Sequence, residues 1–251
     1  MTSIAERRAA FSALHQSGCF VLPNPWDGGS ATRFQKLGFK AIASTSAGMA
    51  WAWGRADGDV TVDEVLAHLA MLSAVCDLPL NADFEAGFAD TAAGVGAHVA
   101  RCIETGVAGL SIEDKIGKGF YPLDEACHRI AAARAAIDAS GEDVVLVGRC
   151  EAYLMTELDM DEVLRRLNAY AEAGADCLYA PGVKTLADHA RLVSETSRPI
   201  NANLTGTGLS VADFASVGVR RVSVGAAVAS ATWKAFDGVA QLLADEGRLP
   251  S

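Results

Sequence analysis

The chain has 251 residues, of which 51% are hydrophobic and 21% charged, so it can build a folded core and lacks the composition of a disordered protein. Its 31 acidic and 21 basic residues give a formal charge of −10, which excludes nucleic acid as an expected partner because phosphate binding needs clustered Lys and Arg. No apolar segment of about 18 residues and no signal-peptide pattern occurs, so we expect a soluble, cytoplasmic protein that does not bind membranes.

One pattern repeats along the chain: a short run rich in Val, Ile and Leu, then polar or small residues, then a longer amphipathic stretch. The short runs are continuous, as in parallel strands that are covered on both faces. They predict strands at 19–24, 41–46, 79–84, 108–113, 144–150, 176–180, 199–204 and 221–225. The amphipathic stretches predict helices at 29–37, 61–76, 91–105, 123–139, 159–173, 184–194, 210–216 and 226–246.

The junctions between these segments support the same order. Gly38, Gly106, Gly174 and Gly218 each end a helical stretch, where a residue tolerant of positive φ is preferred. Eight βα units in about 250 residues match the size of a (β/α)8 barrel. We therefore predict an α/β protein with the TIM-barrel fold, as a single domain over residues 1–251.

The competing architecture is an open, doubly wound sheet. Its dinucleotide fingerprint is missing, because Gly206-Thr-Gly208 and Gly94-Val-Gly96 lack the third glycine and do not follow the first strand. The barrel is therefore preferred.

The cysteines and histidines give no sign of a soft-metal site. The six cysteines are scattered and no two are spaced as C-x-x-C, which is typical of reduced thiols in a cytoplasm. No two of the five histidines are paired at a spacing that suits zinc.

Polar residues gather after the predicted strands, where a TIM barrel places its chemistry. Asp57 follows the second strand, Asp83 and Glu85 the third, and Glu113 the fourth. Carboxylates that lie close together raise one another's pKa unless a cation lies among them. Oxygen ligands without His or Cys favour Mg²⁺, with Mn²⁺ as the alternative.

Arg149, at the end of the fifth strand, suits a substrate carboxylate, so we expect a small anionic, oxygen-rich substrate.

Structural interpretations of the charged residues stay open at this stage. Asp27 and Asp114 suit helix capping or an internal salt bridge as well as metal contact. Arg149 can also neutralise Glu113 or Glu151 inside the barrel.

The uncharged residues have two interpretations as well. Asn201, Asn203 and Ser223 fit polar fillers of the upper barrel layer as well as substrate ligands. Trp51 and Trp53 fit either the barrel mouth or a subunit interface.

Several motifs occur in a recognisable order. The chain carries N-A-D-F-E-A-G-F at 81–88 and G-V-A-G-L-S-I-E-D at 106–114. Further motifs are N-P-W-D-G-G-S-A (24–31), T-S-A-G (45–48), G-R-A-D (54–57), V-G-R-C-E-A (147–152) and A-G-A-D-C-L-Y-A-P-G (173–182). Together they resemble the motifs of the isocitrate lyase/phosphoenolpyruvate mutase superfamily, and the resemblance spans nearly the whole chain.

The resemblance implies a (β/α)8 barrel whose last helix is exchanged between subunits, and so a homo-oligomer, either a dimer or a tetramer. It also implies a metal site. By this resemblance Asp83 would be the direct Mg²⁺ ligand, and Glu85, Glu113 and Asp57 would hold metal-bound waters.

The resemblance further implies how the substrate binds. Ser46, Ala47 and Gly48 would hold the oxo-acid end through backbone N–H groups and the Ser46 hydroxyl, and Arg149 would bind a carboxylate. Asn201 and Ser223, candidates from their strand positions, complete the expected substrate-binding set. Family chemistry makes or breaks a C–C or P–C bond beside a 2-oxo acid through a metal-bound enolate.

The segment D-K-I-G-K-G-F-Y-P-L at 114–123 matches the family's mobile loop. Lys115, Lys118 and Tyr121 are its candidate proton carriers, and we expect Lys115 to be catalytic together with Ser46 and Arg149. The loop departs from isocitrate and methylisocitrate lyases, which carry K-K-C-G-H, because it has no Cys or His. It also lacks the asparagine of the phosphoenolpyruvate mutases.

These departures favour a Mg²⁺-dependent lyase that cleaves a C–C bond of a small 2-oxo or 2-hydroxy dicarboxylate, such as oxaloacetate or a substituted malate. The alternatives within the fold are a mutase-type enzyme that forms or cleaves phosphonates and an oxaloacetate hydrolase. An alternative of another class is a metabolite-binding barrel without catalysis.

Overall fold

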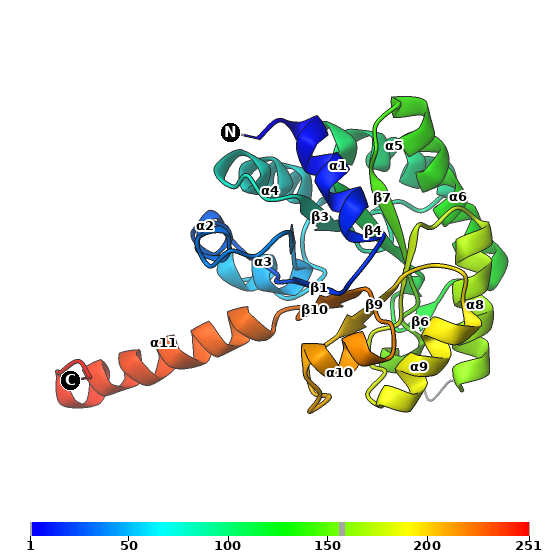
Figure 1. The fold of residues 1–251 in the computed structure, drawn as a ribbon. Coiled ribbons are helices and arrows are strands. Elements are labelled where there is room, and N and C mark those ends of the chain that lie inside the picture. The colour runs from blue at the N-terminus through cyan, green and yellow to red at the C-terminus, as the bar shows by residue number, and fades with distance from the viewer. Residues whose placement is uncertain (1, 156–158, 251) are drawn as a thin grey trace.

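Eight parallel strands form one sheet that curls into a nearly closed barrel (Figure 1). The computed structural model describes residues 2–155 and 159–250. The sheet has the order β1-β10-β9-β8-β7-β4-β3-β2. Its strands are β1 (Phe20–Leu22), β2 (Ile42–Ala43), β3 (Leu80–Asp83), β4 (Gly109–Glu113), β7 (Val145–Arg149), β8 (Cys177–Tyr179), β9 (Ile200–Asn203) and β10 (Arg221–Ser223). Just beyond β1, the carbonyl of Pro23 accepts a hydrogen bond from the N–H of Ala43 at 3.0 Å, which brings the two sheet edges together.

Helices connect successive strands and cover the outside of the barrel (Figure 1). The connecting helices are α2 (Gly28–Lys36), α4 (Val62–Val75), α5 (Ala92–Glu104), α6 (Leu123–Ser140), α8 (Met160–Glu172), α9 (Leu186–Glu195) and α10 (Val211–Ser216), and α11 (Ala227–Glu246) follows the last strand. Thr61 and Glu64 form the capping box of α4. The predicted (β/α)8 fold is therefore confirmed.

Three helices and one two-stranded hairpin were not predicted. They are α1 (Ile4–Leu14), α3 (Ser46–Ala52), α7 (Ala152–Met155) and a hairpin of β5 (Lys115–Ile116) and β6 (Gly119–Phe120). The predicted strand at 41–46 was too long, because it ends at Ala43 and Ser46 already begins a helix. The side chain of Thr45 accepts a hydrogen bond from the N–H of Gly48 and so caps that helix, which moves Ser46 from a strand to a helix N-terminus.

The apolar core has two layers. The larger one fills the space between the sheet and the helices, and the smaller one lies inside the barrel. Phe11 of α1 closes the bottom of the interior, where its ring makes edge-to-face contacts with those of His15 and Phe20. A Cβ atom on Gly109 would lie 2.6 Å from the Phe11 ring, so this strand needs glycine. The bottom is thus sealed by apolar groups, and the polar interior residues lie above it.

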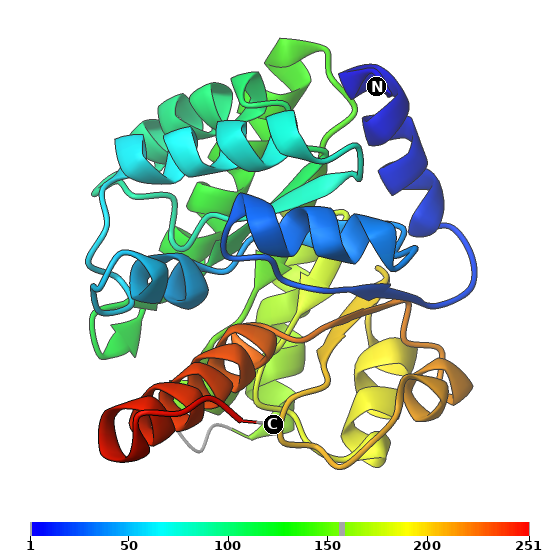
Figure 2. The same cartoon turned by 90° about the vertical axis from the view of Figure 1, so that its left-hand side faces the viewer.

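The last helix, α11, extends away from the barrel (Figures 1 and 2). Ala229 is its one buried residue within the described part of the chain. Phe236, Val239 and Leu243 are exposed. Trp51 lines a shallow surface hollow together with Trp233 of this helix, so it lies beside α11 on the barrel surface. Over residues 2–155 and 159–250, no helix combines the length and the apolar character that a bilayer span requires.

Candidate active site

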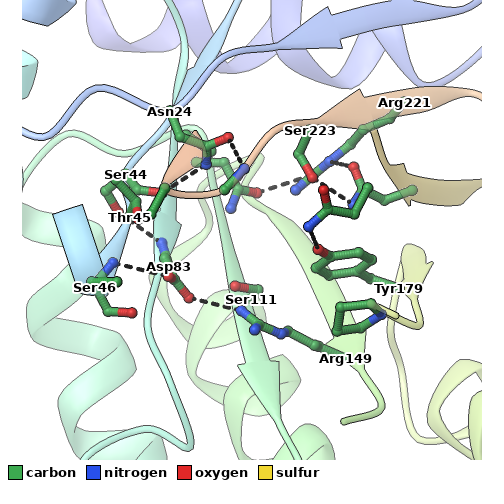
Figure 3. A pocket seen from close by; sticks show the side chains of 18 of the residues that line it. Asn24, Ser44, Thr45, Ser46, Asp83, Ser111, Arg149, Tyr179, Arg221 and Ser223 are labelled. Carbon is green, nitrogen blue, oxygen red and sulfur yellow. Dashed lines mark hydrogen bonds and ion pairs between the residues drawn. The ribbon is translucent and has the colours of Figure 1, made fainter. Parts of the chain in front are cut away.

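A polar cavity of about 160 Å³ opens at the carboxyl ends of the barrel strands (Figure 3). Seven of the residues predicted for the site line it: Ser46, Ala47, Asp57, Asp83, Arg149, Asn201 and Ser223. Four others do not line it: Gly48, Glu85, Glu113 and Lys115. The barrel thus brings most of the predicted residues to one place from five different strands and the loops that follow them.

Arg149 lies among three carboxylates. Its Nη1 is 3.2 Å from Asp83 Oδ1, and its Nε is 3.4 Å from Glu113 Oε2 and 2.5 Å from Glu151 Oε1. Its other terminal nitrogen, Nη2, forms no hydrogen bond within the described residues. Arg149 therefore does neutralise acids inside the barrel, and its Nη2 group remains available as a hydrogen-bond donor.

Asp83 links the third strand to the second. Its Oδ2 accepts a hydrogen bond from the N–H of Ser46 at 3.0 Å, and its own N–H donates to Ser44 Oγ at 2.8 Å. With Arg149 on Oδ1, the carboxylate is held from two sides (Figure 3). It is the best positioned of the predicted metal ligands, because it both lines the cavity and has a fixed orientation.

Glu85 has an unusual backbone and an unusual environment. Its φ is 44°, a left-handed conformation that costs a non-glycine residue about 1–2 kcal/mol. Burial, followed by the nearby charges of Asp83 and Asp57, raises the pKa of Glu85 to about 7. Its Oε1 is buried without a hydrogen-bond partner in the described structure. Strain and an unpaired polar atom are typical of functional positions.

Glu113 is likewise hard to ionise. Its burial raises the pKa to about 8, and the charges of Glu151, Asp83 and Glu85 act in the same direction, while Arg149 opposes them. The guanidinium of Arg149 thus does not offset burial and the neighbouring acids together, and a divalent cation would favour the ionised form of these carboxyls.

The donor set suits a cation that keeps its own water. Among the described residues, no three His, Cys, Asp or Glu side chains lie close enough to form a metal site by themselves. Mg²⁺ does not need such a set, because it usually takes one or two carboxylates directly and retains several waters. Asp83 at the cavity wall, with Glu85 and Glu113 behind it, fits that pattern, and the unpaired Oε1 of Glu85 is an acceptor for such a water.

The segment after the second strand forms the first turn of α3. The N–H of Ser46 is bonded to Asp83 and that of Gly48 to Thr45 Oγ1, whereas that of Ala47 has no acceptor in the described structure. A Cβ atom on Gly48 would lie 2.6 Å from the Thr45 side chain and 3.0 Å from that of Trp26. Gly48 therefore permits close packing, while Ser46 and Ala47 face the cavity.

The loop after the fourth strand forms the β5–β6 hairpin at one side of the mouth. Lys115 and Lys118 are exposed, and the charge of Lys115 lowers the pKa of Glu85. The ring of Tyr121 instead lies against the guanidinium of Arg129, 3.8 Å away. Of the three proton carriers considered, Lys115 thus has an electrostatic link to the acidic cluster, and Tyr121 is engaged elsewhere.

Two acids have structural roles. Asp27 is the N-cap of α2, where its side chain accepts a hydrogen bond from the N–H of Ser30. Asp114 accepts hydrogen bonds from Tyr170 at 2.6 Å and from Arg166 at 3.2 Å. The structural interpretation holds for both.

The deepest wall of the cavity contains a residue that was not predicted. Arg221, from β10, donates from Nε to Asn201 Oδ1 at 2.9 Å and from Nη1 to Asn81 Oδ1 at 3.2 Å. Asn201 also donates to Ser223 Oγ at 3.0 Å. Arg221 lies two residues before Ser223 on the same strand, so the period of two along a strand, which places both on one face, was a signal that could have identified it.

Comparisons with known proteins agree with this geometry. The family model described as phosphoenolpyruvate phosphomutase matches residues 11–244. An uncharacterized protein of Mycobacterium tuberculosis is 32% identical over 244 residues, which cover 96% of this chain and 91% of that protein.

Solved structures show the same barrel. A putative lyase/mutase from Burkholderia cenocepacia has a TM-score of 0.95 and 40% identity, covering 98% of this chain and 91% of that one. An oxaloacetate acetylhydrolase in complex with its product oxalate has a TM-score of 0.92 and 26% identity, covering 100% and 91%.

Proposed function

The chain belongs to the isocitrate lyase/phosphoenolpyruvate mutase superfamily of enzymes, and on that premise we propose that it is a Mg²⁺-dependent carbon–carbon lyase. The proposed substrate is a small 2-oxo or 2-hydroxy dicarboxylate such as oxaloacetate or a substituted malate. The observation that carries the proposal is the group of acids at the cavity, Asp83, Glu85 and Glu113. Burial first, and then the charges of neighbouring acids, raise the pKa values of Glu85 and Glu113.

Asp83 would hold the metal directly, and Glu85, Glu113 and Asp57 would hold it through water. Mn²⁺ satisfies the same oxygen ligands. When bound, the cation supplies a Lewis acid that stabilises negative charge developing on the 2-oxo oxygen of the substrate.

The chain's own residues orient the substrate. The Ala47 N–H and the Ser46 hydroxyl lie at the cavity wall and would donate to the oxo-acid end, with Gly48 allowing the tight turn behind them. The unused Nη2 of Arg149 is available for a carboxylate. Asn201 and Ser223 provide further polar groups that line the cavity. Such fixed donors stabilise developing charge because they need no reorganisation.

Lys115 is the proposed proton carrier. Its charge already influences Glu85, and the hairpin that carries it has glycines at 117 and 119, which allow movement toward the mouth. After the C–C bond is cleaved, it would donate a proton to the carbon atom that has lost its bonding partner.

An oxaloacetate hydrolase is the second candidate, favoured by the likeness to oxaloacetate acetylhydrolase over the whole chain. Product analysis after incubation with oxaloacetate and Mg²⁺ separates the two: a decarboxylating lyase yields pyruvate and CO₂, and a hydrolase yields oxalate and acetate. If neither pair forms, branched malates and phosphonates are tested next, and no turnover of any of them leaves the binding-only barrel.

We also propose a homo-oligomer, a dimer or a tetramer, in which α11 packs on a second copy. The exposed apolar side chains of Phe236, Val239 and Leu243 on a helix with a single buried residue in the described structure support it, because such a surface is costly in water. A cytoplasmic location is proposed as well, and the six free cysteines support it.

A further inference from the structure

Arg221 lies at the inner end of a row of interior side chains. In the sheet register, Arg149 is opposite Tyr179, Tyr179 is opposite Asn201, and Asn201 is opposite Arg221. Residues directly opposite each other project from the same face of a sheet, so all four side chains point into the barrel. Because barrel strands are tilted, such a row also runs along the barrel axis, from the mouth at Arg149 to the floor at Arg221 (Figure 3).

The charge of Arg221 has no counter-ion. The residue is 3% exposed, and its partners are the neutral amide oxygens of Asn201 and Asn81. Within the described residues, no carboxylate lies within 4 Å of its nitrogens. Nη2 forms no hydrogen bond there either. An isolated charge in a protein interior is strongly unfavourable.

The other buried arginines of the described chain are compensated. Arg8, Arg129 and Arg166 each form a salt bridge. Arg7 donates to the carbonyls of Ser73 and Cys76, at the C-terminal end of α4, where the helix dipole is negative. Arg221 has neither kind of compensation, and it borders a cavity.

Among the described residues that line the cavity, Arg149 is the one other positively charged side chain. Arg149 is already paired with Asp83, Glu113 and Glu151. The remaining floor residues that face the cavity are neutral, namely Asn81, Ser111, Asn201 and Ser223. An oxyanion that reached the floor would meet one unpaired guanidinium ringed by amides and hydroxyls, which is a favourable environment for it.

We infer that Arg221 anchors a second oxyanion group of the substrate, a carboxylate or a phosphonate, at the floor of the barrel. This inference rests on the proposed function and adds a specificity-determining residue to it. The oxo-acid end stays at the mouth beside Asp83 and Ser46, and the far acid group points inward. The site would then select compounds with two acid groups over those of the same length with one.

Three ligands of equal chain length test this selection: malate, 2-hydroxybutyrate and 3-phosphonolactate. They differ only in the far group, which is a carboxylate, a methyl or a phosphonate. Affinities are measured by calorimetry with the full-length protein and Mg²⁺. A charged hydrogen bond predicts that the wild type binds malate about 10- to 100-fold more tightly than 2-hydroxybutyrate. The relative affinity of 3-phosphonolactate shows which acid group the floor prefers.

Two variants assign the effect to Arg221. Arg221→Gln keeps hydrogen bonding but removes the charge, and should lower the malate preference about 5- to 10-fold below that of the wild type, the difference between a charged and a neutral hydrogen bond. Asn81→Asp places a carboxylate beside the guanidinium, which should stabilise the fold and also remove the preference, so the test survives if the first variant does not fold. Arg7→Gln is the matched control, because Arg7 is another buried arginine without a carboxylate, and should keep the wild-type preference.

The inference is overturned if the wild type binds malate no more tightly than 2-hydroxybutyrate, or if Arg221→Gln or Asn81→Asp retains the wild-type ratio. Either result leaves the lyase proposal intact when oxaloacetate is turned over. Conversely, suppose that the protein prefers malate through Arg221 and yet turns over none of the substrates. That result supports the proposed role of Arg221 and contradicts the proposed lyase function.

Discussion

We predict that the metal-free protein becomes less stable as the pH rises, because Glu85 and Glu113 have raised pKa values in the folded chain. Glu113 has a pKa of about 8 in the folded chain, against an ordinary value of 4.5. The folded protein therefore retains a proton that the unfolded chain has lost, and the free energy of unfolding decreases across this interval. The slope is about 1.4 kcal/mol per pH unit for each retained proton.

Buried histidines have the opposite effect on stability, and they decide over which pH range the effect of the acids can be measured. Burial lowers the pKa of His15 and of His68 to about 4, so these residues add stability as the pH rises toward 6.5. At pH 6.5 about half of each histidine is still protonated in the unfolded chain, so this contribution continues to rise until about pH 7.5. Burial also lowers the pKa of His189, which acts in the same direction. Between pH 6.5 and 7.5 the larger contribution comes from Glu113, with part of a proton from Glu85, whose pKa is about 7. The expected net loss is about 1 kcal/mol.

Urea unfolding in EDTA at pH 6.5, 7.0 and 7.5 measures this slope. Glu113→Gln should flatten it by about 1.4 kcal/mol per pH unit. Glu162→Gln should not change it, because hydrogen bonding to Arg165 lowers the pKa of Glu162 and moves its linkage to acid pH. Equal slopes for the wild type and Glu113→Gln, or a wild-type stability that rises over this window, would refute the reasoning.

Three further predictions follow from single contacts. Arg149→Met removes the arginine partner of Asp83 and of the buried acids Glu113 and Glu151, and should cost about 3–5 kcal/mol in chemical denaturation. Arg191→Met, in an exposed ion pair, should cost less than about 1 kcal/mol, and similar losses for the two would contradict the assigned role. Glu85→Gly should be more stable than Glu85→Ala by about 1 kcal/mol because only glycine accepts the left-handed backbone without strain, and the opposite order in thermal melts would show that strain is absent. Phe236→Asp should lower the mass measured by light scattering if α11 packs on a second copy, and an unchanged oligomer would place the interface elsewhere.

The eight βα units could be predicted because each has its own local signal. Apolar runs mark the strands, and Gly38 and Gly106, with φ of 83° and 87°, end their helices as the sequence indicated. The helix at Ser46 was missed because the segment 41–46 was interpreted as one strand, although Thr45 is the N-cap of a helix that is separated from the strand by two residues. The N-terminal helix had a signal in Ser3 and Glu6, which form a capping box, but no strand precedes it to suggest a βα unit.

The site was predictable as far as strand ends could be located. Asp83 and Arg149 were placed correctly at the mouth because both follow apolar runs. The left-handed conformation of Glu85, and which of its two expected acids Arg149 approaches more closely, depend on how the loops pack, which composition does not encode. Arg221 escaped notice because it begins its strand instead of ending it, and only the barrel's tilt brings it under the cavity.

The most direct test of the account is turnover by Asp83→Asn. The substrate is whichever acid the wild type cleaves with Mg²⁺, and product formation is followed with metal present and after EDTA. The account predicts that EDTA abolishes wild-type turnover, that Mg²⁺ restores it, and that Asp83→Asn remains inactive at any Mg²⁺ concentration while still folded. Full turnover by Asp83→Asn, or by the EDTA-treated wild type, would contradict it.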